Sequence, residues 1–434
     1  MNFNHREILS QSNLQNSLKN TWDIHTYHKK LDMISIHCDD VIEIWKKNLI
    51  FQCKKLAKKI QLDFQDSKFL YNNLENTMSV QAACLTEIFR NKNISKNSAN
   101  LNVKKIHQLF LKQIQKGYIK FAIAWGHCKR TCGLLKTETY HADFAELYSI
   151  SILYLIAKVA YLLTNLPVEI KVVSGGLRFN DSLFANLDEI KQYDKERQDI
   201  ANMLCDEKIN IHFFTIELDN SDKELIHANS INISSQATTS KFENILCNID
   251  WRNIFLNIRS AHNINIPSEI SQYRDIDSLI AASVVCLLNK KAQKDFTTVF
   301  NSPLLTITMN IMKNITTLST KKYIATHQIN KDIVSSDYLR LTVHNKPDKS
   351  DIPAIYLLGT NGGNQLSQHC TMFIENNQEI RFITHYEAKL MNCVKVINAN
   401  TSSLFHWCNN ALLFYAKNNV AEIEKAIQTI KFIA

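Results

Sequence analysis

The chain has 434 residues, of which 45% are hydrophobic and 21% charged. This composition excludes disorder over the whole length and leaves apolar material for about two or three domains. With only 8 glycines and 5 prolines, the chain has few residues for long irregular loops. Lys and Arg number 50 against 41 for Asp and Glu, and this net charge of +9 suits an anionic small molecule as well as a nucleic acid.

The first 117 residues are predicted to form an all-helical N-terminal region. In residues 39–64, apolar residues recur at steps of three and four with lysines between them, which is typical of an amphipathic helix. Residues 91–102 have no apolar pattern and are predicted to be a linker or an exposed loop.

A change of period at Tyr118 marks the start of an α/β region. The run YIKFAIAW predicts a strand, residues 143–163 predict a long apolar helix closed by Asn165 and Pro167, and VEIKVVS predicts a second strand. A helix over residues 187–205 and a third strand from Ile209 follow. This alternation is typical of parallel βαβ units.

Short strands return late in the chain, after a mostly helical stretch over residues 220–330. They are expected at Tyr338, Ala354, Arg381 and Val394 and over residues 370–374, with some antiparallel pairing, before a closing helix over residues 421–432. The predicted fold class is therefore α/β: a Rossmann-like, mainly parallel sheet with additional late strands, over residues 118–434, preceded by the helical region 1–117.

The eleven cysteines are odd in number, scattered and without a CxxC pair. They indicate neither a disulfide framework nor a zinc ribbon and favour a reducing compartment. The amino terminus is polar, and the longest apolar run is broken by Ser149, Ser151 and Lys158. We expect a soluble, cytoplasmic protein that buries this helix and has no membrane partner.

The glycines indicate one crevice. Those at or just beyond the carboxyl ends of predicted strands are Gly126, Gly175, Gly176, Gly359, Gly362 and Gly363. Ligands of open α/β sheets bind outside those ends. The first loop brings Lys129, Arg130 and Lys136 there with no acid before Glu138, which predicts phosphate or carboxylate binding; the alternative is a solvated basic loop.

The same loop contains His127, Cys128 and Cys132, which are residue types that bind zinc. No second pair of ligands lies at a fitting spacing, so no metal site is predicted. Buried, inert cysteines are favoured over a thiol activated by the neighbouring cations.

Asp143 and Glu146 share one face of the first turn of the long helix. The favoured interpretation is an N-cap at Asp143 with Glu146 completing a capping box. The alternative is substrate binding, and both hold if one carboxylate also receives a substrate amine.

Arg340, Thr342 and His344 alternate along one predicted strand, so they are expected on one face. A cation, a hydroxyl and an imidazole on one face are typical of a binding or catalytic site. The alternative is the solvated outer face of an edge strand. His369 and His385 are weaker candidates.

These residues fall in an ordered set of motifs that resembles the isocyanide (isonitrile) synthase family, also called the pyoverdine/dityrosine biosynthesis family. The family's first strand, basic loop and acidic helix start resemble IKFAIAWGHCKRTCGLLKTETYHADFAEL, onto which Lys129, Lys136, Asp143 and Glu146 fall. Its second strand and the following loop resemble EIKVVSGGLRFND, with Arg178 matching.

Three later motifs continue the resemblance in the same order. The family's next helix resembles SLFANLDEIKQYDKERQDI, with Asp188 and Tyr193 matching. Its RLS(I/V)HP strand resembles YLRLTVHNKP, with Arg340 and His344 matching, and LSQHCTMFI with His369 lies where the family has a PWH-type motif. The resemblance spans about residues 118–400 and leaves the first 117 uncovered.

The resemblance implies an enzyme that converts the α-amine of an amino acid to an isocyanide in specialised metabolism, with ribulose 5-phosphate as carbon donor and no metal or other cofactor. The expected catalytic residues are His344, His369, Asp143 and Glu146. The expected substrate-binding residues are Lys129, Arg130, Lys136, Arg178 and Arg340. The expected partners are the amino acid and the pentose phosphate, and a homodimer stays open.

Three alternatives remain at this stage. The first is a nucleic-acid-binding protein that uses residues 89–137, which contain eleven cations and no acid. Against it, few aromatic residues are placed for stacking and no recognition motif is present. The others are a divergent, non-catalytic family member and a scaffold whose helical region docks a partner.

Overall fold

The computed structural model describes most of the chain after residue 23. The described residues are 24–71, 74, 76–126, 128–129, 135–257, 265–289, 292–300, 302–329, 335–345, 349–362, 365–375, 379–399, 403, 405–409, 412–417 and 420–432. Arg130, His127 and Cys132 lie outside these residues, and so does the side chain of Arg178.

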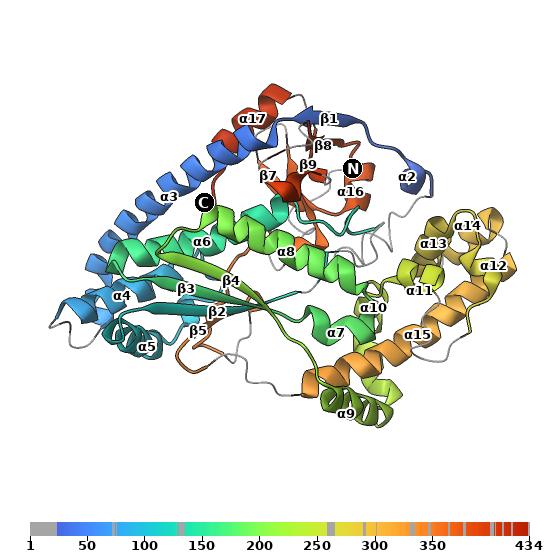
Figure 1. The fold of residues 1–434 in the computed structure, drawn as a ribbon, viewed down its shortest axis with the longest axis horizontal. Coiled ribbons are helices and arrows are strands. Elements are labelled where there is room, and N and C mark those ends of the chain that lie inside the picture. Colours follow the sequence, from blue (N-terminus) through green and yellow to red (C-terminus); the bar gives the residue numbers. More distant parts are fainter. Residues whose placement is uncertain are drawn as a thin grey trace.

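A parallel sheet forms the predicted α/β core. Its strand order is β4 (Ile209–Thr215), β3 (Val168–Ser174), β2 (Ile119–Trp125) and β5 (Leu339–Leu341). Helix α6 (Phe144–Thr164) connects β2 to β3, and α8 (Leu187–Leu204) follows between β3 and β4. Both helices cover the same face of the sheet (Figure 1). The prediction of a Rossmann-like sheet of βαβ units is confirmed.

The ends of α6 are determined by local sequence. The Asp143 side chain accepts the Ala145 N–H, and the Glu146 carboxylate accepts the Asp143 N–H, so the predicted capping box is present. Asn165 ends the helix in the left-handed region at φ 58°, which its short polar side chain tolerates. These caps satisfy backbone groups that the helix itself leaves without partners.

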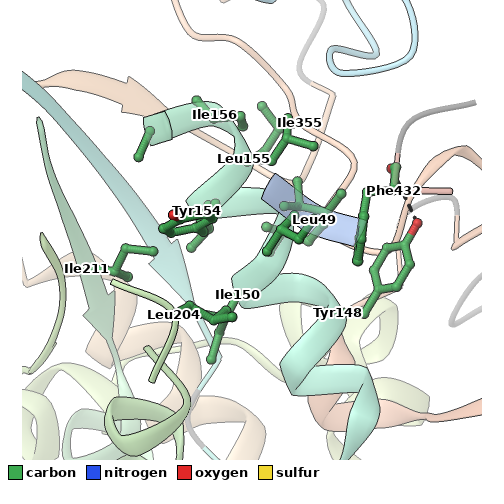
Figure 2. Close-up of a cluster of buried hydrophobic side chains, with 14 of the residues drawn as sticks. Leu49, Tyr148, Ile150, Tyr154, Leu155, Ile156, Leu204, Ile211, Ile355 and Phe432 are labelled. Atoms are coloured by element: carbon green, nitrogen blue, oxygen red, sulfur yellow. Dashed lines mark hydrogen bonds between the residues drawn. The ribbon is translucent and has the colours of Figure 1, made fainter. Parts of the chain in front are cut away.

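The middle of α6 is a core helix. It is long and apolar enough to cross a membrane, but 83% of its most apolar window is buried inside the protein. Figure 2 shows Ile150 and Tyr154 of α6 in one cluster with Leu204 of α8 and Ile211 of β4. The prediction that this segment is a buried helix is therefore confirmed.

The late strands form a second, mixed sheet. Its order is β1 (Met33–Ile36), β8 (Val394–Asn398), β9 (Leu412–Ala416), β6 (Thr371–Ile374) and β7 (Ile380–Ile383). The β6–β7 and β8–β9 pairs are antiparallel, as expected for some of these strands, whereas β1–β8 and β6–β9 are parallel. The predicted strand at Ala354 is wrong, because Ala354 and Ile355 make only isolated bridges.

The described part of the N-terminal region, from residue 24 on, is mainly helical, and its strand β1 joins the second sheet. The described helices are α2 (Ile24–His28), α3 (Cys38–Ser67), α4 (Thr77–Arg90) and α5 (Val103–Gln115). Trp45 of α3 and Phe89 of α4 belong to the same hydrophobic core as Phe121 of β2. This core thus continues across the predicted boundary at residue 117.

Residues 91–102 are not an exposed linker, which corrects the prediction. The Lys96 N–H donates to the Ala354 carbonyl at 2.7 Å, and the buried Asn97 side chain donates to the Ile352 carbonyl and accepts the Ala354 N–H. Because these contacts are made by polar groups, the segment has no apolar period in the sequence.

A group of helices extends from the carboxyl edge of the parallel sheet (Figure 1). They are α7 (Gly176–Leu183), α9 (Asn220–Ile231), α10 (Ser235–Leu246), α11 (Trp251–Asn257), α12 (Ser268–Ser271), α13 (Ile276–Leu288), α14 (Ala292–Val299) and α15 (Ser302–Gln328). All of them except α9 share a second hydrophobic core, and Ile226 of α9 packs in a separate small cluster with Ala325 of α15 and Ile329. Two helices of the C-terminal part, α16 (His385–Leu390) and α17 (Val420–Gln428), complete the fold.

Candidate active site

The carboxyl ends of β2 and β3 form the edge of the sheet at which Gly126 and Gly175 predict a ligand site. Gly126 follows β2 and Gly175 follows β3, and the parallel register brings Trp125 opposite Ser174. The amino terminus of α6 lies at this edge, because α6 follows the β2 loop. Parallel strands of this fold class present their ligand sites here.

A buried ion cluster lies at the amino terminus of α6. The Lys129 ammonium is 2.8 Å from Asp143 Oδ2 and 2.5 Å from Glu146 Oε2. The exposed fractions of the three side chains are 1%, 3% and 0%. One cation between two carboxylates leaves a net charge of −1 in the interior when all three are ionised.

Two hydroxyl groups complete the cluster. Tyr193 of α8 donates its hydroxyl to Glu146 Oε1 at 2.9 Å, and Thr371 of β6 donates to Asp143 Oδ2 at 2.9 Å. Both donors are buried. The cluster therefore joins the basic loop, α6, α8 and the second sheet.

Burial controls the proton affinities of the cluster. It raises the pKa of Asp143 to about 7, against the opposing attraction of Lys129 and with a further contribution from the negative charge of Glu146. Burial alone would lower the pKa of Lys129, but the two carboxylates outweigh it and the pKa is raised. Burial also raises the pKa of Tyr193, beside Glu146. The raised pKa brings the proton affinity of the Asp143 carboxyl group close to neutral pH.

Helix capping does not account for the whole cluster. A capping box needs Asp143 and Glu146 but no lysine, and burying an ammonium costs free energy that an ion pair recovers only in good geometry. Here Lys129 has that geometry with both carboxylates. The arrangement therefore provides a positioned proton donor and acceptor set in addition to the cap.

Several buried polar atoms near the end of β2 have no hydrogen-bond partner. They are Trp125 Nε1, Ser367 Oγ, Gln368 Oε1 and Arg197 Nε. The Gln368 amide packs directly on Gly126, where an added Cβ would lie 1.5 Å from Nε2. Unpartnered buried polar groups are rare in proteins and are typical of sites that bind water or a ligand.

Arg197 of α8 supports the backbone at the same edge. Its guanidinium donates to the Gly126 carbonyl at 3.0 Å and to Ser174 Oγ at 3.3 Å, and it pairs with Asp194. The side chain is fully buried and lies over the rings of Trp125 and Tyr193. This arginine fixes the carboxyl ends of β2 and β3 relative to α8.

Sequence reasoning missed Tyr193, Thr371 and Arg197 as site residues. Tyr193 was available from the motif in SLFANLDEIKQYDKERQDI, and Arg197 lies one helical turn later on the same face as Tyr193. Thr371 carried no signal, because its contact with Asp143 joins positions 228 residues apart.

The other predicted site residues lie in different surroundings. Lys136 is buried and donates to Asn248 Oδ1 at 2.7 Å, just beyond α10. His369 is half-buried in a single 3₁₀ turn between the sheets. Arg340 is exposed on β5 and projects from the face opposite α6, whereas Lys129 contacts α6.

Burial alternates along this segment as the sequence predicts, because Leu339, Leu341 and Val343 are buried, Thr342 is half-buried, and Arg340 and His344 are exposed. Strand β5 itself ends at Leu341, and the Thr342 hydroxyl accepts the His344 N–H at 3.2 Å.

Cys128 is a buried thiol. Burial raises its pKa, and nearby carboxylates contribute in the same direction. The favoured interpretation of an inert cysteine therefore fits its surroundings better than a thiol activated by cations.

No family model matches the chain, and no curated protein matches it. Among solved structures, the chain is similar to the crystal structure of the PvcA protein from Pseudomonas aeruginosa. The match has 14% sequence identity and a TM-score of 0.44, and it covers 77% of this chain and 100% of that one. Similarity this low identifies neither a substrate nor a reaction for the chain.

Proposed function

We propose that the chain is an enzyme of the isocyanide synthase type, which converts the α-amine of an amino acid to an isocyanide with ribulose 5-phosphate as carbon donor. One observation carries the proposal. Lys129, Asp143 and Glu146 come from one motif of the family resemblance and Tyr193 from another, and all four meet in one buried hydrogen-bonded cluster. Motif residues with only structural roles in separate elements have no reason to converge in this way.

The cluster supplies the groups that the first chemical step needs. The amine attacks the ketone carbon, a C–N bond forms, and water leaves once the carbinolamine oxygen is protonated. A carboxyl group with a pKa near 7 both accepts the amine proton and donates to the leaving oxygen at neutral pH. Asp143 is assigned this role, and Lys129 and Tyr193 hold the charge and position of Glu146 beside it.

The remaining assignments belong to the same proposal. Lys136 and Arg130 bind the phosphate or carboxylate of the substrates. His369 transfers protons, and it directly follows Ser367 and Gln368, whose Oγ and Oε1 atoms have no hydrogen-bond partner. The free cysteines among the described residues fit a reducing, cytoplasmic location.

The nucleic-acid alternative is not favoured, because acids from elsewhere in the chain neutralise much of the basic stretch. Their ion pairs with it are Arg90–Glu87, Lys105–Asp351, Lys116–Asp337 and Lys120–Glu169. Lys129 is buried with its carboxylates, and Lys136 is buried as well. The stretch that is purely basic in the sequence is therefore partly neutralised in the fold by ion pairs with residues outside it.

The test is direct product detection. The purified protein is incubated with each amino acid and ribulose 5-phosphate labelled with ¹³C at the ketone carbon, and isocyanide is trapped and identified by mass spectrometry. We expect one amino acid to give a trapped product that carries the label. Absence of labelled isocyanide with every amino acid overturns the proposal.

Variants connect the product to the cluster. We expect Asp143→Asn to lower the turnover number by about 10²-fold or more, the usual contribution of a positioned acid–base group. Tyr193→Phe, which removes a hydrogen bond to Glu146, should lower the turnover number less. The matched control is Glu387→Gln, because Glu387 is a buried carboxylate that completes a capping box at α16, like Glu146 at α6. Equal losses in Glu387→Gln and Asp143→Asn would reduce the role of the cluster to folding.

A further inference from the structure

A cavity lies away from the ion cluster, between α5 and the strands β3 and β5. It has a volume of about 940 Å³ and an opening to solvent. The charged residues of the lining, among those that the structure describes, are Lys105, Lys112, Lys171, Arg340 and Asp351. Ligand cavities of proteins have volumes of about 300–1,000 Å³, so this cavity has room for a nucleotide-sized molecule.

The cavity exists because one face of the parallel sheet is polar. On the face that α6 and α8 cover, the strands carry apolar residues such as Phe121, Ile170 and Ile211, which are buried. On the other face, Lys171 is half-buried and Arg340 is exposed. Parallel sheets usually bury both faces under helices, and their strands are then apolar throughout. Charged residues at these positions therefore need a separate explanation.

Two of the cations are arranged in one row across the strands. Arg340 pairs with Ala122, and Ala122 pairs with Lys171. The Cα atoms of Arg340 and Lys171 are thus two strand spacings, or roughly 10 Å, apart. Ala122 between them is only 2% exposed, so the neighbouring side chains cover it. The two long side chains consequently flank one strip of the cavity wall.

The charge balance of the described lining is positive. Its residues include four cations and one carboxylate, and the Lys105–Asp351 pair at 2.6 Å is solvent-exposed, so it holds Lys105 only weakly. Lys171 also lies over the Phe214 ring at 4.4 Å. Leu109, Leu339 and Ile352 add an apolar part to the wall.

We propose that this cavity binds a nucleoside diphosphate or triphosphate. Two or more ionised phosphate groups match the surplus of positive charge, and the arginine fork and lysines are the side chains that recognise phosphate. The apolar part of the wall receives the uncharged portion of the ligand. The described residues that line the cavity include none of the ion cluster, so this site is independent of the isocyanide synthase proposal.

Isothermal titration calorimetry of the full chain with ADP tests the proposal, with AMP and inorganic phosphate as comparison ligands. We expect saturable binding of ADP, weaker binding of AMP, still weaker binding of phosphate, and affinities that fall as salt is added. No binding of ADP at millimolar concentration, or equal affinity for ADP and inorganic phosphate, overturns the proposal.

Charge-matched variants locate the binding. The double variant Lys171→Ala/Arg340→Ala should weaken ADP binding at least about tenfold, whereas Lys54→Ala/Lys58→Ala removes the same charge from the exposed face of α3 and should not. The single variant Arg340→Glu, at an exposed position, should abolish binding with an unchanged melting temperature. Equal weakening in both double variants would indicate a general charge effect and overturn the assignment.

The two proposals fail separately. If ADP does not bind but labelled isocyanide is formed, the nucleotide site is wrong and the enzymatic proposal stands. If ADP binds to the cavity and no amino acid yields isocyanide, the enzymatic proposal is wrong and the nucleotide site stands.

Discussion

Replacing Lys129 by methionine should destabilise the protein severely. The substitution keeps the length of the side chain and removes the cation that lies 2.8 Å from Asp143 and 2.5 Å from Glu146. Two buried carboxylates then lose the cation between them, and the hydroxyls of Tyr193 and Thr371 remain as neutral donors. Breaking a buried ion pair by removing one member costs about 3–5 kcal/mol, which is a large part of the stability of a typical domain.

Urea unfolding at several pH values measures this loss. The cost should be largest at pH 8, above the pKa of about 7 of Asp143, and should shrink at pH 5, where protonation of Asp143 removes one buried negative charge from the folded protein. Adding Glu146→Gln to the Lys129→Met variant should recover part of the stability, since one of the two carboxylates is then gone. The control Lys47→Met changes an exposed lysine of α3 and should be nearly neutral.

The wild-type protein makes a related prediction through Asp143. Its pKa is about 7 when folded and 3.8 in the reference state, so between these pH values the folded protein binds the extra proton. Stability from this group is therefore lost as pH rises from 4 to 7, by at most about 1.4 kcal/mol per pH unit. The difference in unfolding free energy between wild type and Asp143→Asn should show this slope.

For Lys129→Met, a loss of unfolding free energy below about 1 kcal/mol, or a loss that grows as pH falls, would refute this account of the cluster.

Three further predictions concern single side chains. Tyr193→Phe removes the hydroxyl that donates to Glu146 and should lower the unfolding free energy by about 1–3 kcal/mol in urea unfolding, because a buried acceptor loses its donor. Asn97→Ala removes two bonds to the backbone around Ala354 and should cost a similar amount, with faster hydrogen exchange at the Ala354 amide; an unchanged exchange rate would contradict the docking of this segment. Burial lowers the pKa of His385 to about 3 from 6.5, so its stabilising contribution is present above pH 6.5 and lost as pH falls towards 3; His385→Gln should lose less stability than wild type over that window, and an identical pH profile would rule this out.

The parts of the fold that could be predicted are those with local signals. The first strands and α6 follow from changes of apolar period, and the α6 capping box is contained in four consecutive residues beginning at Asp143. Lys129 reaches this cap from a loop only 17 residues before Glu146. The three charged residues of the cluster, Lys129, Asp143 and Glu146, therefore lie within one βα unit of the sequence.

The second sheet could not be predicted in the same way. Strand β1 has four residues, two of them exposed, and its partner β8 lies about 360 residues later, at Lys395 for Met33. No local period identifies such a pairing, because it depends on which edge is available after the rest has folded. The same is true of Thr371, whose role depends on the position of β6 beside α6.

The polar face of the parallel sheet was, in contrast, visible in the sequence. In VEIKVVS and INIHFFT, the residues Glu169, Lys171, Asn210 and His212 alternate with buried apolar residues. A strand covered on both sides would be apolar at nearly every position, so this alternation already indicates a sheet with helices on one face only. The position of α5, whose Phe110 ring packs against Phe121 of β2, was not in the pattern, and α5 supplies Lys105 and Lys112 to the cavity. The alternation explains why Lys171 and Arg340 can be charged. The position of α5 explains why Lys105 and Lys112 line the same cavity, which is large enough for a ligand.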